Sequence, residues 1–121
     1  MNTLDRQEQI ANAFKGIHEN ILAEFKQHEK EENITDDHWE KHGLGTGHSV
    51  IIDDGDFFGK AGINFSNIKG EKLPASSLGS INKSSGLPYF ATGVSVVFHP
   101  KNPNIPTSHL NVRYFCTYKN N

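Results

Sequence analysis

The sequence predicts an α+β domain in which an amino-terminal amphipathic helix packs on an antiparallel β-sheet. Apolar residues recur with a helical period in the first quarter of the chain and with a period of two in several later runs. The later runs are joined by connections of hairpin length, which favours antiparallel pairing. With 121 residues, the chain is expected to form a single domain over 1–121.

The first predicted element is a helix over residues 1–32. Its apolar side chains are spaced by three and four among Gln, Glu and Lys: Ile10, Phe14, Ile17, Ile21 and Phe25. That spacing gives one apolar stripe for packing against a sheet. We expect His18 and His28 at solvated positions on this helix.

Residues 33–47 are predicted to form a turn rich in Trp and Gly. Residues 35–37 could cap a short turn that buries Trp39 as an anchor. The alternating glycines at 43–47 allow a close approach of the backbone to another group. They lack the Gly-Lys-Ser/Thr ending of a P-loop, and strand-like residues follow them, so nucleotide binding is not favoured.

The sheet is predicted over residues 48–119 and contains four strands. They cover 48–53, 56–68, 90–99 and 110–118, and an Asp-Gly pair at 54–55 supplies the first hairpin turn. The connection 69–88 is rich in Ser, Gly, Asn and Lys, and its length predicts a mobile segment. Cys116 falls on an apolar strand face and is expected in the core.

Polar groups interrupt the last two strands on one face. Alternation places five of them together if these strands pair as a hairpin: Ser95, His99, His109, Asn111 and Arg113. One register puts His99 opposite His109 and Ser95 opposite Arg113. Imidazoles suit acid–base chemistry or metal binding, and a guanidinium grips a carboxylate in two places. The pattern alone also fits an ordinary exposed sheet face.

Composition excludes several classes of function. The chain has a net charge of −2, and its sequence contains no cluster of basic residues, so nucleic-acid binding is not expected. No signal-peptide-like start and no run of about eighteen apolar residues is present. We therefore expect a cytoplasmic protein without a membrane span.

Several motifs on and near the last hairpin are specific. They read Gly-Val-Ser at 93–95, His-Pro-Lys-Asn-Pro at 99–103 and Pro-Thr-Ser-His-Leu-Asn-Val-Arg-Tyr-Phe at 106–115. Lys-Ala-Gly-Ile-Asn-Phe-Ser at 60–66 and Trp39 before the glycines add to them. Through these motifs, residues 36–118 resemble the amino-terminal portion of oxygen-dependent coproporphyrinogen III oxidases, enzymes of haem biosynthesis. Leu44, Thr46, His48 and Gly59 depart from that family's pattern.

The resemblance implies an oxidoreductase that converts coproporphyrinogen III to protoporphyrinogen IX by oxidative decarboxylation of two propionates. His109 would be the proton donor, and four residues would contact the substrate: Ser95, Asn111, Val112 and Arg113. His99 and His109 match ligands of a divalent metal, such as manganese, in bacterial members. The resemblance further implies molecular oxygen as co-substrate, no organic cofactor, and a homodimer.

Two alternatives stay open at this stage. The chain could be a non-catalytic module, derived from that enzyme, that binds a tetrapyrrole or a partner subunit. It could also be a metal-binding protein that uses some of its seven histidines.

Overall fold

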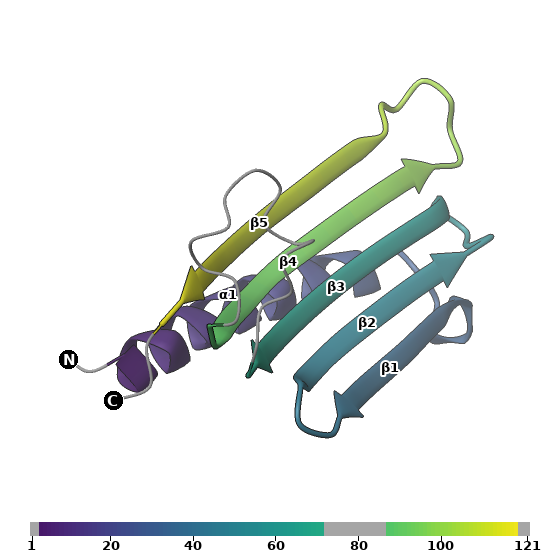
Figure 1. The fold of residues 1–121 in the computed structure, drawn as a ribbon. Coiled ribbons are helices and arrows are strands. Elements are labelled where there is room, and N and C mark those ends of the chain that lie inside the picture. Colours follow the sequence, from purple (N-terminus) through teal and green to yellow (C-terminus); the bar gives the residue numbers. More distant parts are fainter. Residues whose placement is uncertain (1–2, 72–86, 119–121) are drawn as a thin grey trace.

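A computed structural model describes residues 3–71 and 87–118 and shows one helix packed on a five-stranded sheet (Figure 1). The elements in chain order are helix α1 (Thr3–Lys26), the 3₁₀ turn η1 (Glu31–Asn33), and the strands β1 (Ile34–Lys41), β2 (Gly45–Asp53), β3 (Phe58–Gly70), β4 (Tyr89–Pro100) and β5 (Ser108–Thr117). Neighbours in the chain are neighbours in the sheet, and every pair is antiparallel. The predicted α+β class is confirmed.

Helix α1 lies across one face of the sheet and contacts β3 and β4 (Figure 1). Its apolar stripe meets the alternate residues of the central strands that point toward it. One group of buried side chains consists of Leu22, Val50, Ile63, Phe65, Val94 and Val96, and a second of Ile52, Phe58 and Ala61. Burying a Val, Leu, Ile or Phe side chain contributes roughly 1.5–3 kcal/mol, so this layer provides most of the stabilising free energy.

The opposite face of the sheet has no helix over it within the described residues (Figure 1). We call it the open face. Alternation along β3 and β4 determines which side chains lie there, because residues two apart share a side. Ile63 and Val96 face α1, and their neighbours Asn64 and Ser95, which pair with each other, therefore lie on the open face.

The predicted turn at 33–47 is wrong, because most of it is strand. β1 pairs with β2 along its whole length, from Ile34 opposite Ile52 to Lys41 opposite Gly45. β1 is an edge strand, and six of its eight residues are exposed, so its sequence lacks the apolar alternation that reveals a half-buried strand. Trp39 therefore lies within a strand and opposite Gly47, instead of in a capped turn.

The helix ends at Lys26, earlier than the predicted residue 32. The chain then turns so that Glu29 is buried beneath the β2–β3 connection. Its carboxylate accepts hydrogen bonds from the backbone N–H groups of Asp56 (2.8 Å), Phe57 (2.6 Å) and Phe58 (2.7 Å). These bonds hold the segment that follows α1 against the β2–β3 turn. Glu29 reaches this turn because the helix has already ended at Lys26.

The long β3–β4 connection falls largely outside the described residues. β3 and β4 pair out to Gly70 opposite Tyr89, and the predicted mobile segment 69–88 lies beyond that pair except for its ends. Within the described residues, no helix is long and apolar enough to span a bilayer.

Candidate functional site

The β4–β5 hairpin differs from the predicted register by two residues. Val97 lies opposite His109, Ser95 opposite Asn111, and Gly93 opposite Arg113. The predicted pairing of His99 with His109 is wrong. The last β4–β5 pair is Phe98 with Ser108, and His99 pairs only with Lys60 of β3. Residues 99–107 therefore connect the last pair, a connection as long as the 100–108 segment that the predicted register leaves.

A shift of two residues keeps each side chain on its face, because strands alternate with a period of two. Ser95, Asn111 and Arg113 consequently share the open face. Val112 lies on the other side of the sheet, opposite Val94. A substrate on the open face would reach Val112 only through its backbone.

A shallow cavity of about 50 Å³ lies on the open face where β3, β4 and β5 run side by side. Its polar lining comes from all three strands: Asn64, Ser66, Ser95, Asn111 and Arg113. Asn64 and Ser95 are a cross-strand pair, and so are Ser95 and Asn111, which gives an unbroken polar row. Asn64 and Ser66 were not predicted as site residues, although the β3–β4 register would have identified them.

Gly93 forms part of the floor of this cavity beside Arg113. A Cβ atom at Gly93 would lie 2.6 Å from the carbonyl oxygen of Val112 and 3.2 Å from the Cα of Arg113. Glycine therefore lets β5 lie close to β4 at this point. Arg113 is exposed and has no carboxylate partner among the described residues, so its guanidinium is available to an anionic ligand.

Comparison with known proteins shows which family the chain belongs to. The model of the family described as coproporphyrinogen III oxidase matches residues 9–121. This chain belongs to the coproporphyrinogen III oxidase family. It is 40% identical over 111 residues to the oxygen-dependent coproporphyrinogen-III oxidase of Synechococcus sp. (strain CC9605). It is 41% identical over 100 residues to the enzyme of the same name from Prochlorococcus marinus (strain MIT 9313).

The chain spans about a third of the length of these coproporphyrinogen oxidases. The match covers 92% of this chain and 31% of the Synechococcus enzyme, and 83% of this chain and 29% of the Prochlorococcus enzyme. The region that the family model matches, residues 9–121, contains most of the helix and all five strands, and therefore the open-face cavity.

His99 and His109 are both exposed. Since His109 pairs with Val97, the two histidines are diagonal neighbours on the open face, with Cα atoms expected roughly 7–8 Å apart. Among the described residues, neither belongs to a group of three side chains that could bind a metal ion. Two imidazoles fit part of a ligand set, and a complete set needs further donors.

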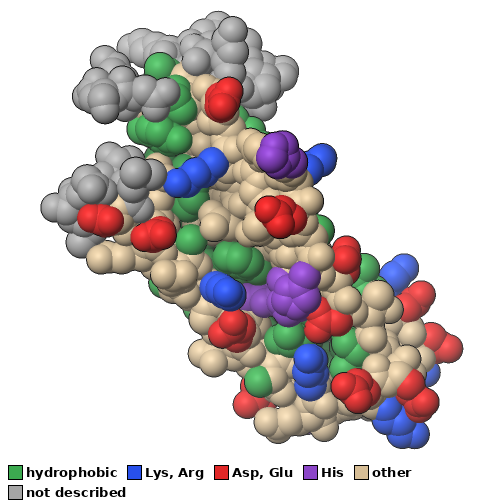
Figure 2. Space-filling model, turned by 90° about the horizontal axis from the view of Figure 1, so that it is seen from below, with side chains coloured by type: hydrophobic (Ala, Val, Ile, Leu, Met, Phe, Trp, Pro, Cys, Tyr) green, Lys and Arg blue, Asp and Glu red, His purple; other side chains and the backbone are tan. Residues whose placement is uncertain are grey.

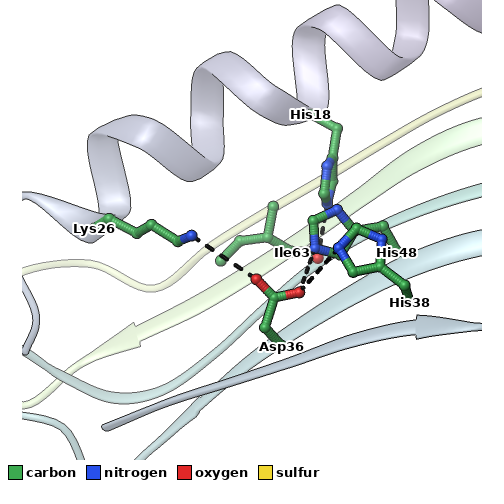
Figure 3. Close-up of polar contacts among 6 residues, drawn as sticks. All are labelled: His18, Lys26, Asp36, His38, His48 and Ile63. Carbon is green, nitrogen blue, oxygen red and sulfur yellow. Dashed lines mark hydrogen bonds and ion pairs between the residues drawn. The ribbon is translucent and has the colours of Figure 1, made fainter. Parts of the chain in front are cut away.

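A second group of ionisable side chains lies on the helix-covered side of the sheet, where side chains of α1 reach residues of β1 and β2 (Figure 3). His18 of α1 is buried there, with 1% of its surface exposed, so the expectation of a solvated His18 is wrong. Its Nε2–H donates to the carbonyl oxygen of Ile63 at 3.0 Å. Burial lowers the pKa of His18 below its ordinary value of 6.5 despite this hydrogen bond.

Proposed function

We propose that this chain carries the porphyrinogen-binding sheet of an oxygen-dependent coproporphyrinogen oxidase. The observation that carries the proposal is the open-face cavity, where Arg113 lacks an acidic partner among the described residues and lies beside Ser95 and Asn111. A guanidinium flanked by neutral hydrogen-bonding groups suits the carboxylate of a propionate. Membership of the family supplies the substrate class.

The proposed reaction removes one carboxyl group from each of two propionates. The bond to the carboxyl carbon breaks and carbon dioxide leaves, while the carbon attached to the pyrrole loses a hydrogen with its electron pair. A vinyl double bond forms between the two remaining carbons. Molecular oxygen takes up the hydrogen and electron pair with one proton and leaves as hydrogen peroxide, so each propionate consumes one oxygen molecule.

The residues divide into binding and proton-transfer roles. Arg113 holds a propionate, and Ser95 and Asn111 donate hydrogen bonds to it, with the backbone of Val112 beside them. His109 lies one position beyond this row, exposed on the same face, and serves as the donor of the proton that oxygen takes up when hydrogen peroxide forms. Imidazole suits that role because its ordinary pKa lies near neutrality.

The remaining partners follow from the same proposal. His99 and His109 supply two ligands for a divalent metal, and the other donors would come from beyond the described residues. Homodimer formation is supported by the outer edge of β5, which has no neighbouring strand within the described part of the chain. Leu110 and Phe115 are exposed apolar side chains on that strand, as an interface requires.

Turnover is tested by incubating the chain with coproporphyrinogen III under air. Protoporphyrin, measured after oxidation of the products, and hydrogen peroxide should accumulate at two peroxide molecules for each product molecule. His109→Ala should abolish turnover without abolishing binding. Lack of product with the unsubstituted chain would remove the catalytic proposal for this chain.

Binding is tested separately by titrating coproporphyrin III and following its fluorescence. Arg113→Ala should weaken affinity by about 10-fold or more, as expected when a charge-assisted hydrogen bond is lost. Arg6→Ala is the matched control, because Arg6 is an exposed arginine of α1 that does not line the cavity. Equal effects of the two substitutions would contradict the proposed site.

The second candidate function is tetrapyrrole binding without turnover. It is favoured by His109, which has an exposed side chain and no hydrogen-bond partner among the described residues to orient it. Saturable binding that depends on Arg113, together with no peroxide release, would identify this function.

A further inference from the structure

Three potential metal ligands converge on the edge of the sheet formed by β1 and β2, opposite the open face. Asp36 and His38 are two apart in β1, so both point to the same side, and His38 lies directly opposite His48 of β2. The three ligand atoms lie within 4.8 Å of one another. This is the only such group found among residues 3–71 and 87–118.

The two imidazoles converge on one oxygen of the carboxylate. His48 Nε2 lies 2.5 Å and His38 Nε2 lies 3.5 Å from Asp36 Oδ1 (Figure 3). The rings stack at 3.7 Å between centroids with an angle of 22°, and both Nε2 atoms lie near the same carboxylate oxygen. Strand pairing imposes this geometry, because opposite residues in an antiparallel pair have Cβ atoms only about 4.5–5.5 Å apart.

A lysine orients the carboxylate of Asp36 through the oxygen that does not face the two histidines. Lys26 of α1 contacts the other oxygen, Asp36 Oδ2, at 3.8 Å (Figure 3). Carboxylates that bind metals usually have such an outer partner, which orients them. Lys26 is half-exposed and its ion pair is long, so it competes weakly with a divalent ion.

His18 of α1 lies next to the group, with its ring 4.9 Å from that of His48. The Nε2–H of His18 donates a hydrogen bond to the carbonyl oxygen of Ile63, so this nitrogen does not face a metal ion. His18 is therefore a neighbour of the three ligands and not one of them.

A cavity of about 410 Å³ opens beside the two histidines. Its lining includes His38, His48, Lys15 and Glu19, the last two from α1. Histidine side chains gather with acidic and basic ones on the face seen in Figure 2. The cavity leaves room for water or a small anion at any coordination position that the three protein ligands do not fill.

We propose that Asp36, His38 and His48 form a binding site for a divalent first-row transition-metal ion, of which Zn²⁺ has the matching chemistry. Two imidazole nitrogens and one carboxylate oxygen are a ligand set that Zn²⁺ accepts, with a fourth position open. The site is separate from His99 and His109 and does not depend on the proposed oxidase function.

The test uses Zn²⁺ alone as the probe, by isothermal titration calorimetry of the metal-free chain. We expect one high-affinity ion per chain. His38→Ala and Asp36→Asn should each weaken binding by more than about 10-fold, since even the loss of an outer partner typically costs 10-fold to 100-fold. His38→Cys keeps a ligand at that position and should retain most of the affinity.

The matched control is His42→Ala, because His42 is an exposed histidine in the β1–β2 turn outside the group. It should leave Zn²⁺ affinity unchanged, as should the double substitution of His99 and His109 by Ala. Circular dichroism checks that each variant is folded. Unchanged affinity in folded His38→Ala and Asp36→Asn would overturn the proposal, as would a loss confined to the His99/His109 variant.

Imidazole ¹H–¹⁵N spectra of the unsubstituted chain give a readout that needs no variant. One equivalent of Zn²⁺ should shift the ring signals of His38 and His48 and leave those of His42 and His109 in place. Shifts at other histidines only, or no shift at all, would contradict a site at the β1–β2 edge.

Discussion

The indole ring of Trp39 covers the backbone of Gly47, its cross-strand partner. A Cβ atom at Gly47 would overlap Cζ2, Cε2 and Nε1 of the indole. The absence of a side chain at Gly47 is what lets Trp39 lie against β2 in a half-buried position. The glycine-rich segment thus serves strand packing at this residue.

Gly47→Ala should displace the Trp39 ring and lower the free energy of unfolding by about 1–3 kcal/mol, the usual cost of overpacking. Trp39 is the sole tryptophan, so its emission should shift to longer wavelength as the ring becomes solvated. Gly16→Ala is the matched control, because nothing lies within 4 Å of a Cβ there and alanine favours a helix. That substitution should stabilise the protein by up to about 1 kcal/mol.

The buried Glu29 carboxylate predicts acid sensitivity. Burial acts to raise its pKa, but the N–H groups of Asp56, Phe57 and Phe58 outweigh burial and hold the pKa below the ordinary value of 4.5. The unfolded chain therefore binds the proton more tightly, so the contribution is complete above about pH 4.5 and is lost as the pH falls through the lower folded pKa. Urea unfolding at a series of pH values should show this decrease.

Glu29→Gln should lower the free energy of unfolding by about 1–3 kcal/mol at neutral pH, because an amide nitrogen cannot accept these hydrogen bonds. It should also flatten the acid limb of the pH profile. Glu24→Gln, at an exposed position of α1, should do neither. An acid limb that persists unchanged in Glu29→Gln would assign the acid sensitivity to other carboxylates.

His18 predicts a second pH dependence in a higher range. Burial, aided by His48 and opposed by the hydrogen bond to Ile63, keeps the folded-state pKa below 6.5. Stability should be complete above about pH 6.5 and fall as the pH drops from there toward the folded pKa, because the unfolded chain gains the proton first. His18→Gln can still donate to Ile63 and should remove this slope, whereas His42→Gln should retain it.

Val94→Ala and Val112→Ala should differ in their effect on the free energy of unfolding, although the two valines are cross-strand partners. Val94 is 1% exposed beneath α1, while Val112, directly opposite in β5, is 37% exposed. Val94→Ala should cost about 1–3 kcal/mol of unfolding free energy through lost burial and a residual cavity. Val112→Ala should cost less than about 1 kcal/mol. Chemical denaturation of both variants would show whether burial against α1 stabilises β4 at Val94 more than β5 at Val112.

The period of two was sufficient to predict that Ser95, Asn111 and Arg113 share one face of the sheet. A register error of two residues leaves each side chain on the same face. The register itself depends on the connection that follows Phe98. That connection contains prolines at 100, 103 and 106, which have no N–H group to donate to a neighbouring strand, and the period of two does not show where pairing stops. The use of these residues as a site is still a prediction.

Sequence reasoning failed where tertiary contacts override local preference. β1 is mostly polar because it is an edge strand, and its pairing with β2 rather than its composition makes it a strand. His18 reads as one more polar residue on α1, and only the position of β3 beneath it shows why it is buried. The Asp36, His38 and His48 group could have been found only if β1 had been recognised as a strand paired with β2.

The unbroken order β1-β2-β3-β4-β5 has a consequence for how the protein folds. Each strand pairs only with its neighbours in the chain, so the sheet can grow one hairpin at a time with short loop closures, except between β3 and β4. Helix α1 is synthesised first, yet its packing partners β3 and β4 are joined by the longest connection. The β3–β4 pairing is therefore expected to limit the folding rate, and destabilising this pair should slow folding more than a change in β1 or β5.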